Sequence, residues 1–318
     1  MHDFITMNVS FIIVSWNAKR HLLECLESLI KESKGHDAGI IVVDNGSTDG
    51  STKAVREIFS GVMLIENGEN LGFARANNIG IRNCKGKYVC FVNSDVTVLE
   101  GSIEAMYNYM ERHPTVGILG PQILNSDNTI QPSCKSFPAL WNNFCRTMAL
   151  DSVFPKARFF EGEFMTYWAH DTIRPVDIIV GCCWMVRRTA IDEVGLLDER
   201  FFIYSEDKDW CKRFHEKGWE VIYFPEAKAI HYGGASSSNA PIRFYLEMQK
   251  ANLQYWDKHH GRISTVLFRW MLIINNLCRL IGYKIIKTYA GESSKNIIEK
   301  IERSKAFLRW IRHEMAIL

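Results

Sequence analysis

The chain has 318 residues, of which 47% are hydrophobic and 23% charged, and its formal net charge is +2. This composition is ordinary for a soluble globular protein, and the length allows one large domain or a domain with an appendage. The small net charge hides an asymmetry, because residues 243–318 hold 14 Lys and Arg against 6 Asp and Glu, whereas residues 1–242 hold 24 against 30.

The nine cysteines form no CxxC pair, and Cys182 and Cys183 are adjacent, which is poor geometry for a disulfide between them. We therefore expect mostly buried thiols in a reducing compartment. The apolar run at 9–14 is too short for a signal peptide and has no basic segment before it. These features predict a cytoplasmic protein.

The first third of the chain alternates between short apolar runs and helical patterns. The apolar runs predict strands at 9–15, 40–43, 62–66 and 87–92. The patterns between them predict helices at 18–33, 51–59 and 74–84. This alternation predicts a parallel sheet with right-handed crossovers. Ligands of such sheets bind beyond the carboxyl ends of the strands, where Ser15, Asp44 and Asp95 fall.

The rest of the chain is less regular. Residues 125–176 hold four prolines and many aromatic side chains without a clear period, which predicts long loops and short helices over the ligand site. Beyond them the pattern predicts strands at 176–186 and 220–224 and helices at 189–194 and 208–217. An isolated histidine, His231, follows the last of these strands.

Two turns near the strand ends could contact a nucleotide. The carboxylate of Asp44, which opens Asp-Asn-Gly-Ser-Thr-Asp-Gly, can accept a hydrogen bond from a base N–H or a ribose hydroxyl. Asp, Asn and Ser also form caps and turns routinely, so this heptad alone favours a structural interpretation. Gly72 precedes a predicted helix start, where free N–H groups and the helix dipole favour a phosphate, although one glycine is a weak signature.

A second group of residues could hold a cation. Asp95, in Asn93-Ser-Asp95, can bind Mg²⁺ or Mn²⁺ whose other ligands are diphosphate oxygens. Taken singly, Asp95 is more simply a strand-ending turn residue and His231 a structural histidine. Coupled with a nearby carboxylate pair, the two residues form a credible metal site.

Three carboxyl groups crowd one short segment. Glu206, Asp207 and Asp209 fall within four positions among aromatic and apolar neighbours. Like charges this close cannot all ionise at low cost, so at least one should have a raised pKa or face a cation. A raised pKa suits a general base, whereas the alternative is a solvated acidic turn. Gly181, which opens Gly-Cys-Cys-Trp, lets the backbone approach a ligand closely.

The ordered set of motifs is more informative than any one of them. It comprises Val14-Ser-Trp-Asn17, residues 42–50, 70–80, 91–95, 181–188 and 197–209, and His231. In this order and spacing, over residues 8–240, the chain resembles the family 2 glycosyltransferases of the GT-A fold, and more narrowly their rhamnosyltransferase-like branch.

The resemblance implies an α/β GT-A fold, with a mostly parallel, Rossmann-like central sheet flanked by helices and a helical C-terminal extension. The catalytic domain would span residues 1–242, with a nucleotide-sugar half at 1–125 and an acceptor-side half at 126–242. Residues 243–318 would form a basic amphipathic helical region.

The resemblance also implies a role for each motif residue. The residues implied to bind the donor are Ser15, Asn17, Asp44, Gly72, Asn77, Asn93, Asp95 and Gly181. Among them, Asp44 would face the pyrimidine, and Asp95 would hold Mg²⁺ or Mn²⁺ with help from His231. Asp207 would be the catalytic base, with Glu206 beside it.

The chain departs from the family pattern at two positions. Asn93 replaces the first carboxylate of the DxD-type motif, so cation binding would depend on Asp95, His231 and the diphosphate. Cys182 stands where a small residue often follows the glycine of its motif, which leaves the fit of the sugar open.

The implied reaction is a single inverting displacement, in which Asp207 takes the proton from an acceptor hydroxyl that attacks the anomeric carbon. The branch favours dTDP-rhamnose as donor and a glycan or lipid-linked glycan of bacterial surface polysaccharide synthesis as acceptor. UDP-sugars such as UDP-galactofuranose or a hexose are alternatives, as is a non-catalytic protein that binds nucleotide sugars or carbohydrate. A nucleotidyltransferase could share the sheet and metal chemistry, but Glu206 and Asp207 with His231 favour glycosyl transfer.

The C-terminal stretch 264–287 is apolar but interrupted by Arg269, Asn275, Asn276 and Arg279, so it is a poor membrane span by the requirement of about 20 apolar residues. An amphipathic basic helix on an anionic bilayer, at the inner face of the plasma membrane, fits better. A helix packed on the catalytic domain or on a second copy in a homo-oligomer is equally compatible. The tail has few aromatic residues and no nucleic-acid motif, so we expect no nucleic-acid partner.

Overall fold

The computed structural model describes residues 8–154, 156–160, 163–165, 167–234, 240–289 and 295–317. The chain forms two compact units. The first comprises Met1–Phe137, Phe164–Phe202 and Glu206–Ser236, and the second Pro138–Glu163, Ile203–Ser205 and Ser237–Leu318. Residues 138–163, expected in the acceptor-side half, thus group with the C-terminal helices.

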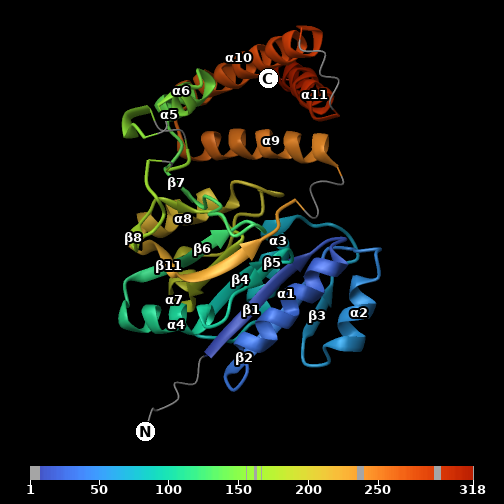
Figure 1. Cartoon of the computed structure of the whole chain (residues 1–318), viewed down its shortest axis with the longest axis vertical. Helices are drawn as coiled ribbons and strands as arrows, with labels where there is room; N and C mark the ends of the chain where they lie inside the picture. Colours follow the sequence, from blue (N-terminus) through green and yellow to red (C-terminus); the bar gives the residue numbers. More distant parts are fainter. Residues whose placement is uncertain are drawn as a thin grey trace. The chain divides into compact units, whose positions relative to one another are not determined.

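The first unit is built on one mixed sheet, whose strands follow the order β3-β2-β1-β4-β10-β6-β11-β5, with β8 paired to β11 (Figure 1). These strands are β1 (Asn8–Ser15), β2 (Asp37–Asp44), β3 (Met63–Glu66), β4 (Tyr88–Asn93), β5 (Val96–Val98), β6 (Val116–Leu124), β8 (Arg174–Pro175), β10 (Cys183–Arg187) and β11 (Glu220–His231). A separate two-stranded sheet pairs β7 (Cys134–Lys135) with β9 (Ile178–Ile179).

The first half of the sheet is parallel, as predicted. Strand β1 runs parallel to β2 and β4, and β2 runs parallel to β3. Strand β10 lies antiparallel between β4 and β6, and β6 is parallel to β11. The structure therefore confirms the mostly parallel α/β sheet, and it adds an antiparallel strand at the centre.

Helices cover both faces of this sheet, which explains why its strands are continuous apolar runs. Phe11 and Ile13 of β1 point into one core cluster and Ile12 into the other, as the two-residue period of a strand requires. The helices of the first unit are α1 (Lys19–Glu32), α2 (Ser51–Ile58), α3 (Phe73–Asn83), α4 (Ser102–Arg112), α7 (Arg188–Val194) and α8 (Glu206–Glu216). Helices α1 and α4 pack in the first cluster, and α7 and α8 in the second.

Several elements differ from the prediction. The strand predicted at 176–186 is divided into β9 and β10 by a turn at residues 181–182. Strand β11 continues past 224 and ends at His231. Helix α8 begins at Glu206 rather than 208, so all three crowded carboxyl groups lie in its first turn, where the helix dipole favours acidic side chains. No element had been assigned to α4 or β6.

The second unit is helical, which confirms the predicted C-terminal helical extension. It contains α5 (Leu140–Thr147), α6 (Leu150–Val153), a 3₁₀ turn η1 (Arg158–Phe160), α9 (Pro241–His259), α10 (Arg262–Tyr289) and α11 (Lys295–Ile317). Trp256 of α9 stacks on Phe268 of α10 with ring centroids 4.4 Å apart, and Asn275 of α10 donates to Thr147 at 3.2 Å.

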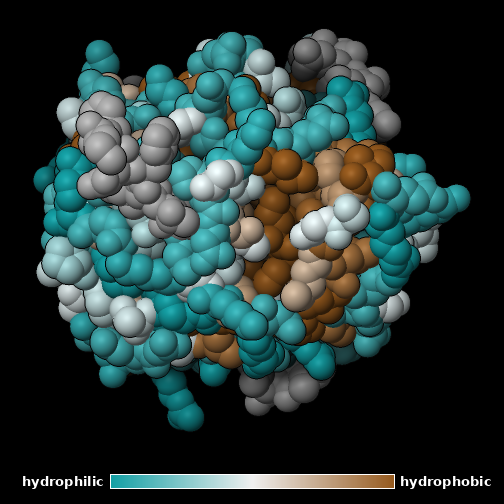
Figure 2. Space-filling view, turned by 90° about the horizontal axis from the view of Figure 1, so that it is seen from below, coloured by the Kyte–Doolittle hydropathy of each residue, from teal (hydrophilic) through white to brown (hydrophobic). Residues whose placement is uncertain are grey.

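The surface is largely polar. Hydrophilic residues cover most of the face drawn in Figure 2, and hydrophobic residues gather in one part of it. Among the described residues, one helix, α10, is long and apolar enough to cross a membrane by length and composition alone.

Candidate active site

The carboxyl ends of three parallel strands lie next to each other in the first unit. Ser15 ends β1 and is in register with Asp44 at the end of β2. Asn93 ends β4 and is in register with Val14 of β1. The parallel pairing therefore brings Ser15, Asp44 and Asn93 to one edge of the sheet.

Asp44 and Ser15 place two unpaired polar atoms at this edge. One carboxylate oxygen of Asp44, Oδ2, accepts hydrogen bonds from the backbone N–H groups of Gly46 at 3.1 Å and Ser47 at 2.9 Å. The other oxygen, Oδ1, and the Ser15 hydroxyl are buried and have no hydrogen-bond partner among the described residues. Because an unpaired buried polar group is costly, both atoms are ready to bond a ligand.

Asn17 connects the loops that follow β1 and β2. Its backbone N–H donates to the Ser47 hydroxyl at 2.9 Å, and the Thr48 N–H donates to its Oδ1 at 2.8 Å. The residue has a φ of 50°, in the left-handed region that Asn tolerates better than most side chains. Its carboxamide oxygen thus shapes the loop beside Asp44.

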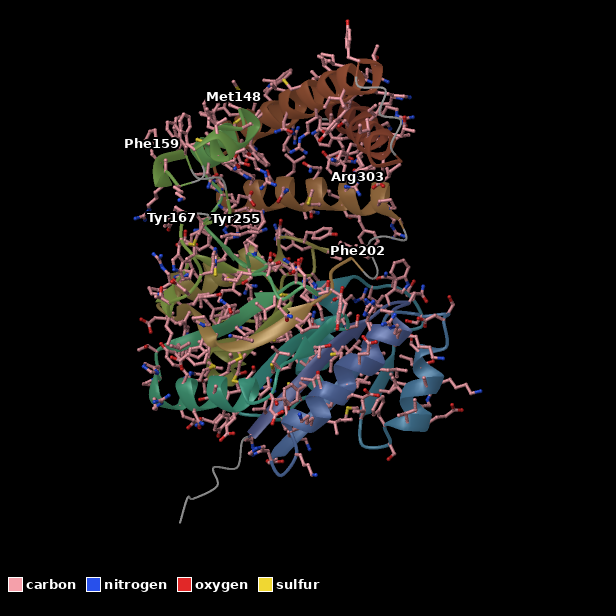
Figure 3. The ribbon with its side chains drawn as sticks, in the orientation of Figure 1. Met148, Phe159, Tyr167, Phe202, Tyr255 and Arg303 are labelled. Atoms are coloured by element: carbon pink, nitrogen blue, oxygen red, sulfur yellow. The ribbon has the colours of Figure 1, made fainter. Side chains whose placement is uncertain are left out.

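Gly72 is required by a close approach of two backbone segments. A Cβ at this position would lie 2.4 Å from the carbonyl oxygen of Phe202, whose ring is labelled in Figure 3, and φ is +85°. The loop is tied to the end of β2 by Asn45, whose Nδ2 donates to the Gly72 carbonyl at 3.1 Å. Asn77 is buried one turn further into α3, and its Nδ2 donates to the Phe73 carbonyl at 3.0 Å. Packing within the first unit therefore accounts for both Gly72 and Asn77.

Asp95 and His231 meet at the end of β11. Nε2 of His231 lies 3.4 Å from Oδ1 of Asp95, and both side chains are mostly buried. The neighbouring backbone is tied together, since the Tyr232 N–H donates to the Asp95 carbonyl at 3.0 Å. Oδ1 of Asn93 is also buried and has no hydrogen-bond partner among the described residues.

Asp95, His231 and Asn93 could bind a cation only if a bound ligand supplied the remaining coordinating atoms. Within the described part of the chain, no group of three or more His, Cys, Asp or Glu side chains could hold a metal alone. Cis ligands of a six-coordinate Mg²⁺ lie roughly 3 Å apart, close to the separation of Asp95 and His231. A carboxylate, an imidazole and an unpaired amide oxygen form an incomplete donor set, which diphosphate oxygens could complete.

The first turn of α8 holds two buried carboxyl groups in unlike environments. Glu206 is 6% exposed, and its Oε2 has no partner among the described residues. Burial raises the pKa of Glu206 well above its usual value, and the neighbouring Asp207 raises it further. Oδ1 of Asp207 accepts from the Lys208 N–H at 2.8 Å. The crowding thus has the effect on proton affinity that the sequence predicts.

Gly181 lies directly against Asp207. A Cβ at Gly181 would be 3.6 Å from the Cβ of Asp207 and 3.0 Å from Cζ2 of Trp184. The chain enters α8 through Tyr204 and Ser205, which have φ values of 70° and 64°. Consecutive non-glycine residues in the left-handed region are costly, and such strain concentrates at functional sites.

Two residues that support the site are not among the site residues predicted from the sequence. Asn45 ties the Gly72 loop to β2, and Gln131 contacts His231 from 100 positions away in the chain. The Asx-rich stretch 125–128 predicts a turn before Gln131, but no local signal indicates which residue the turn brings it to.

Comparison with known proteins identifies the family of the chain. The model of the family "Glycosyl transferase family 2" matches residues 10–195, more than half of the chain. An N-acetylglucosaminyl-diphospho-decaprenol L-rhamnosyltransferase of Mycobacterium tuberculosis is 29% identical over 276 residues, which cover 82% of this chain and 88% of the relative. A dTDP-rhamnosyl transferase of Shigella flexneri is 26% identical over 265 residues, covering 79% and 81%.

Among solved structures, a mannosyltransferase from Pyrobaculum calidifontis, in complex with GDP-mannose and Mn²⁺, superposes with a TM-score of 0.57 at 16% identity. The match covers 96% of this chain and 86% of that one, and it shows the shared GT-A fold. The chain belongs to glycosyl transferase family 2, as its motifs predict, and the relatives named above are rhamnosyltransferases.

Proposed function

We propose that this glycosyltransferase transfers rhamnose from dTDP-rhamnose, with inversion, to a lipid-linked glycan during bacterial surface polysaccharide synthesis. The relative from Mycobacterium tuberculosis is named for a lipid-linked acceptor and that from Shigella flexneri for the dTDP-rhamnose donor. The observation that carries the proposal is the pair of unlike carboxyl groups, Glu206 and Asp207, beside Gly181. Donors such as UDP-galactofuranose or a UDP-hexose are the alternative.

Asp207 is the general base in this proposal. It would take the proton of the acceptor hydroxyl while the hydroxyl oxygen attacks the anomeric carbon and the bond to the nucleoside diphosphate breaks. Burial raises the pKa of Glu206, so in this proposal it would keep its proton and act as a hydrogen-bond donor rather than as a second base. Its Oε2, which has no partner among the described residues, is the atom available for that bond.

The nucleotide would lie along the carboxyl ends of β1, β2 and β4. Asp44 Oδ1 would accept the imino N–H of a pyrimidine, and the Ser15 hydroxyl lies at the adjacent strand end. Asp95 and His231 would hold Mg²⁺ or Mn²⁺, with the Asn93 amide oxygen nearby. Such a cation stabilises the negative charge that builds on the departing diphosphate.

A panel of nucleotide sugars tests the donor. Thermal unfolding and donor hydrolysis are measured with dTDP-rhamnose, UDP-galactofuranose, UDP-glucose and GDP-mannose, each with Mn²⁺, Mg²⁺ or EDTA. We expect a metal-dependent response to dTDP-rhamnose, worth about 2.7 kcal/mol of stability at a donor concentration 100-fold above Kd. A response to a UDP-sugar instead would overturn the rhamnose assignment, and no response to any donor would favour a non-catalytic carbohydrate-binding role.

Helix α10 is the proposed contact with an anionic membrane surface. A stripe of large apolar side chains runs along it at helical spacing, and these residues are exposed. They are Ile263, Val266, Leu267, Trp270, Ile274, Leu277, Ile281, Ile285 and Tyr289. The same helix carries Arg262, Arg269, Arg279, Lys284 and Lys287 and no acidic residue.

The apolar surface extends beyond this helix within the second unit. Met148 and Phe159, labelled in Figure 3, are 57% and 68% exposed. Helix α5, which Met148 follows, contacts α10. An apolar stripe flanked only by basic charge matches the lipid tails and anionic headgroups of a bilayer, and a lipid-linked acceptor would be reached there. The protein would then work at the cytoplasmic face of the plasma membrane.

Vesicle binding tests this contact. The full chain is sedimented with phosphatidylglycerol or with phosphatidylcholine vesicles, and we expect salt-sensitive binding to the anionic vesicles. The double substitution Trp270→Ser and Ile274→Ser should weaken binding about tenfold or more, whereas Ile58→Ser, at an exposed position of the first unit, should not. Equal binding of all variants, or a concentration-dependent dimer that the double substitution abolishes, would overturn the membrane assignment and favour a homo-oligomer.

A further inference from the structure

The imidazole of His231 is held from both sides. Its Nδ1 lies 2.7 Å from Oε1 of Gln131, and its Nε2 lies 3.4 Å from Oδ1 of Asp95. A neutral imidazole carries its single ring proton on one nitrogen, and the hydrogen bond at one nitrogen decides the state of the other. If the amide oxygen of Gln131 faces Nδ1, the ring proton is on Nδ1 and Nε2 is unprotonated beside Asp95. If the NH₂ group faces Nδ1, the ring proton is on Nε2.

The amide of Gln131 is oriented by an atom that can only accept. Its Nε2 lies 3.3 Å from the backbone carbonyl oxygen of His231 and 2.8 Å from Oδ1 of Asn125. A carbonyl oxygen accepts a hydrogen bond and cannot donate one. The NH₂ group must therefore point to that carbonyl, which leaves the amide oxygen of Gln131 facing Nδ1 of His231.

A second chain of hydrogen bonds leads to the same orientation. The hydroxyl and backbone N–H of Thr129 donate to Asp127 and hold the pKa of that carboxyl below its usual value, so Asp127 is ionised. The Thr129 hydroxyl proton is thus committed to Asp127, and its oxygen accepts from Nδ2 of Asn125 at 2.9 Å. Because Nδ2 of Asn125 donates to Thr129, its Oδ1 accepts a hydrogen bond from the NH₂ group of Gln131.

The backbone keeps these side chains in place. The Asn125 N–H donates to the Thr129 carbonyl at 2.8 Å, which closes a tight loop over residues 125–129. The Gln131 N–H donates to the Ile123 carbonyl at 2.8 Å, so the returning chain lies against the end of β6. Since β11 pairs with β6 as far as Leu124, His231 emerges beside this loop.

We propose that Gln131 is a positioning residue that selects the Nδ1–H form of His231 and thereby presents an unprotonated Nε2 to the cation. The second half of this inference rests on the proposed function, in which Asp95 and His231 bind the metal. An imidazole that ligates a metal through one nitrogen typically donates the other N–H to an oxygen, which fixes the tautomer and the ring orientation. Without Gln131, Nε2 could take the proton and donate to Asp95, so both ligands would be lost to a hydrogen bond.

The tautomer is measured directly in the metal-free full chain. Ring-nitrogen NMR of ¹⁵N-histidine-labelled protein, with the His231 signals identified by their loss in His231→Ala, distinguishes protonated from unprotonated nitrogens. At a pH at which the ring is neutral, we expect a protonated Nδ1 and an unprotonated Nε2 in the wild type. Gln131→Met should move the proton toward Nε2, and an unchanged tautomer in that variant would overturn the inference.

Metal affinity tests whether the tautomer of His231 matters for cation binding. Binding of Mn²⁺ in the presence of dTDP is followed by electron paramagnetic resonance. We expect Gln131→Met to weaken binding by about 10- to 100-fold. Gln122→Met is the matched control, because the Gln122 amide donates to the His170 carbonyl instead.

A failure of the inference about Gln131 and a failure of the proposed metal site would give different results. If His231→Ala weakens Mn²⁺ binding but Gln131→Met does not, the role of Gln131 is overturned while the proposed metal site stands. If Gln131→Met changes the tautomer but neither it nor His231→Ala affects Mn²⁺ binding, the metal role of His231 is overturned.

Discussion

The carboxylate of Asp209, fully buried, forms an ion pair with Arg213 one turn later in α8, with 2.8 Å between Oδ2 and Nε. Arg213 also donates to the backbone carbonyls of Val194 and Leu196. Asp209 therefore stabilises the packing of α8, whereas Asp207 and Glu206 have the catalytic roles in the proposed function. Three carboxyl groups that look alike in sequence have separate functions in the fold.

This separation predicts opposite results for two isosteric substitutions. Asp207→Asn should reduce sugar transfer by about 10²- to 10⁴-fold, because the amide cannot take the acceptor proton, and should leave donor affinity unchanged. Asp209→Asn should instead lower the free energy of unfolding by about 3 kcal/mol, since Arg213 loses its buried partner, with transfer per folded molecule retained. Product formation, donor titration and urea unfolding check both. Transfer by Asp207→Asn at the wild-type rate would exclude this residue as the base.

The raised pKa of Glu206 predicts a specific pH dependence. Its pKa in the folded chain is raised above the usual 4.5, so folding retains a proton that the unfolded chain releases. The contribution is fully present below the unfolded pKa and is lost as the pH rises toward the folded value. Glu206→Gln does not titrate, so its Tm should rise relative to that of the wild type between about pH 5 and pH 8. Parallel Tm curves of the two proteins across this range would show that Glu206 is ionised in both states.

Asp44 should discriminate for pyrimidine nucleotides. In Asp44→Asn one side-chain atom can still accept from Gly46 and Ser47, but the amide then turns its NH₂ group toward the base, where an acceptor is needed. We expect the affinity for dTDP to fall by about 10- to 100-fold, the loss of a charge-assisted hydrogen bond. Calorimetric titration measures it, with Asp37→Asn, at the exposed start of the same strand, as the control. Equal affinities in the two variants would place the base elsewhere.

We expect Gly72 to be required for the backbone conformation rather than for contact with the sugar donor. Its φ of 85° and ψ of 175° lie in a region that is essentially restricted to glycine, and an added Cβ would clash with the Phe202 carbonyl. Gly72→Ala should lower the free energy of unfolding by about 3 kcal/mol. Gly61→Ala, which meets nothing within 4 Å, should be near neutral in the same chemical unfolding experiment. Full stability of Gly72→Ala with weakened donor binding would instead indicate direct contact with the donor.

Local patterns account for much of the fold. Strand β1 was predicted at 9–15 and runs Asn8–Ser15, and α1 was predicted at 18–33 and runs Lys19–Glu32. Apolar periodicity suffices there because both elements bury a regular face. The pairing of β10 between β4 and β6, and the grouping of residues 138–163 with the C-terminal helices, depend on long-range contacts that leave no local trace.

The sequence by itself determined the family, the parallel half of the sheet and the positions of Ser15, Asp44 and Asn93 at strand ends. These are local properties, because a carboxylate or amide that follows an apolar run marks the end of a strand whichever strand it pairs with. Only the tertiary structure decided that Asp209 pairs with Arg213, that burial raises the pKa of Glu206, and that Gln131 contacts His231. Those outcomes depend on burial and on contacts between side chains that are distant in the sequence. Ion pairs, pKa shifts and hydrogen bonds arise only where the fold makes such contacts.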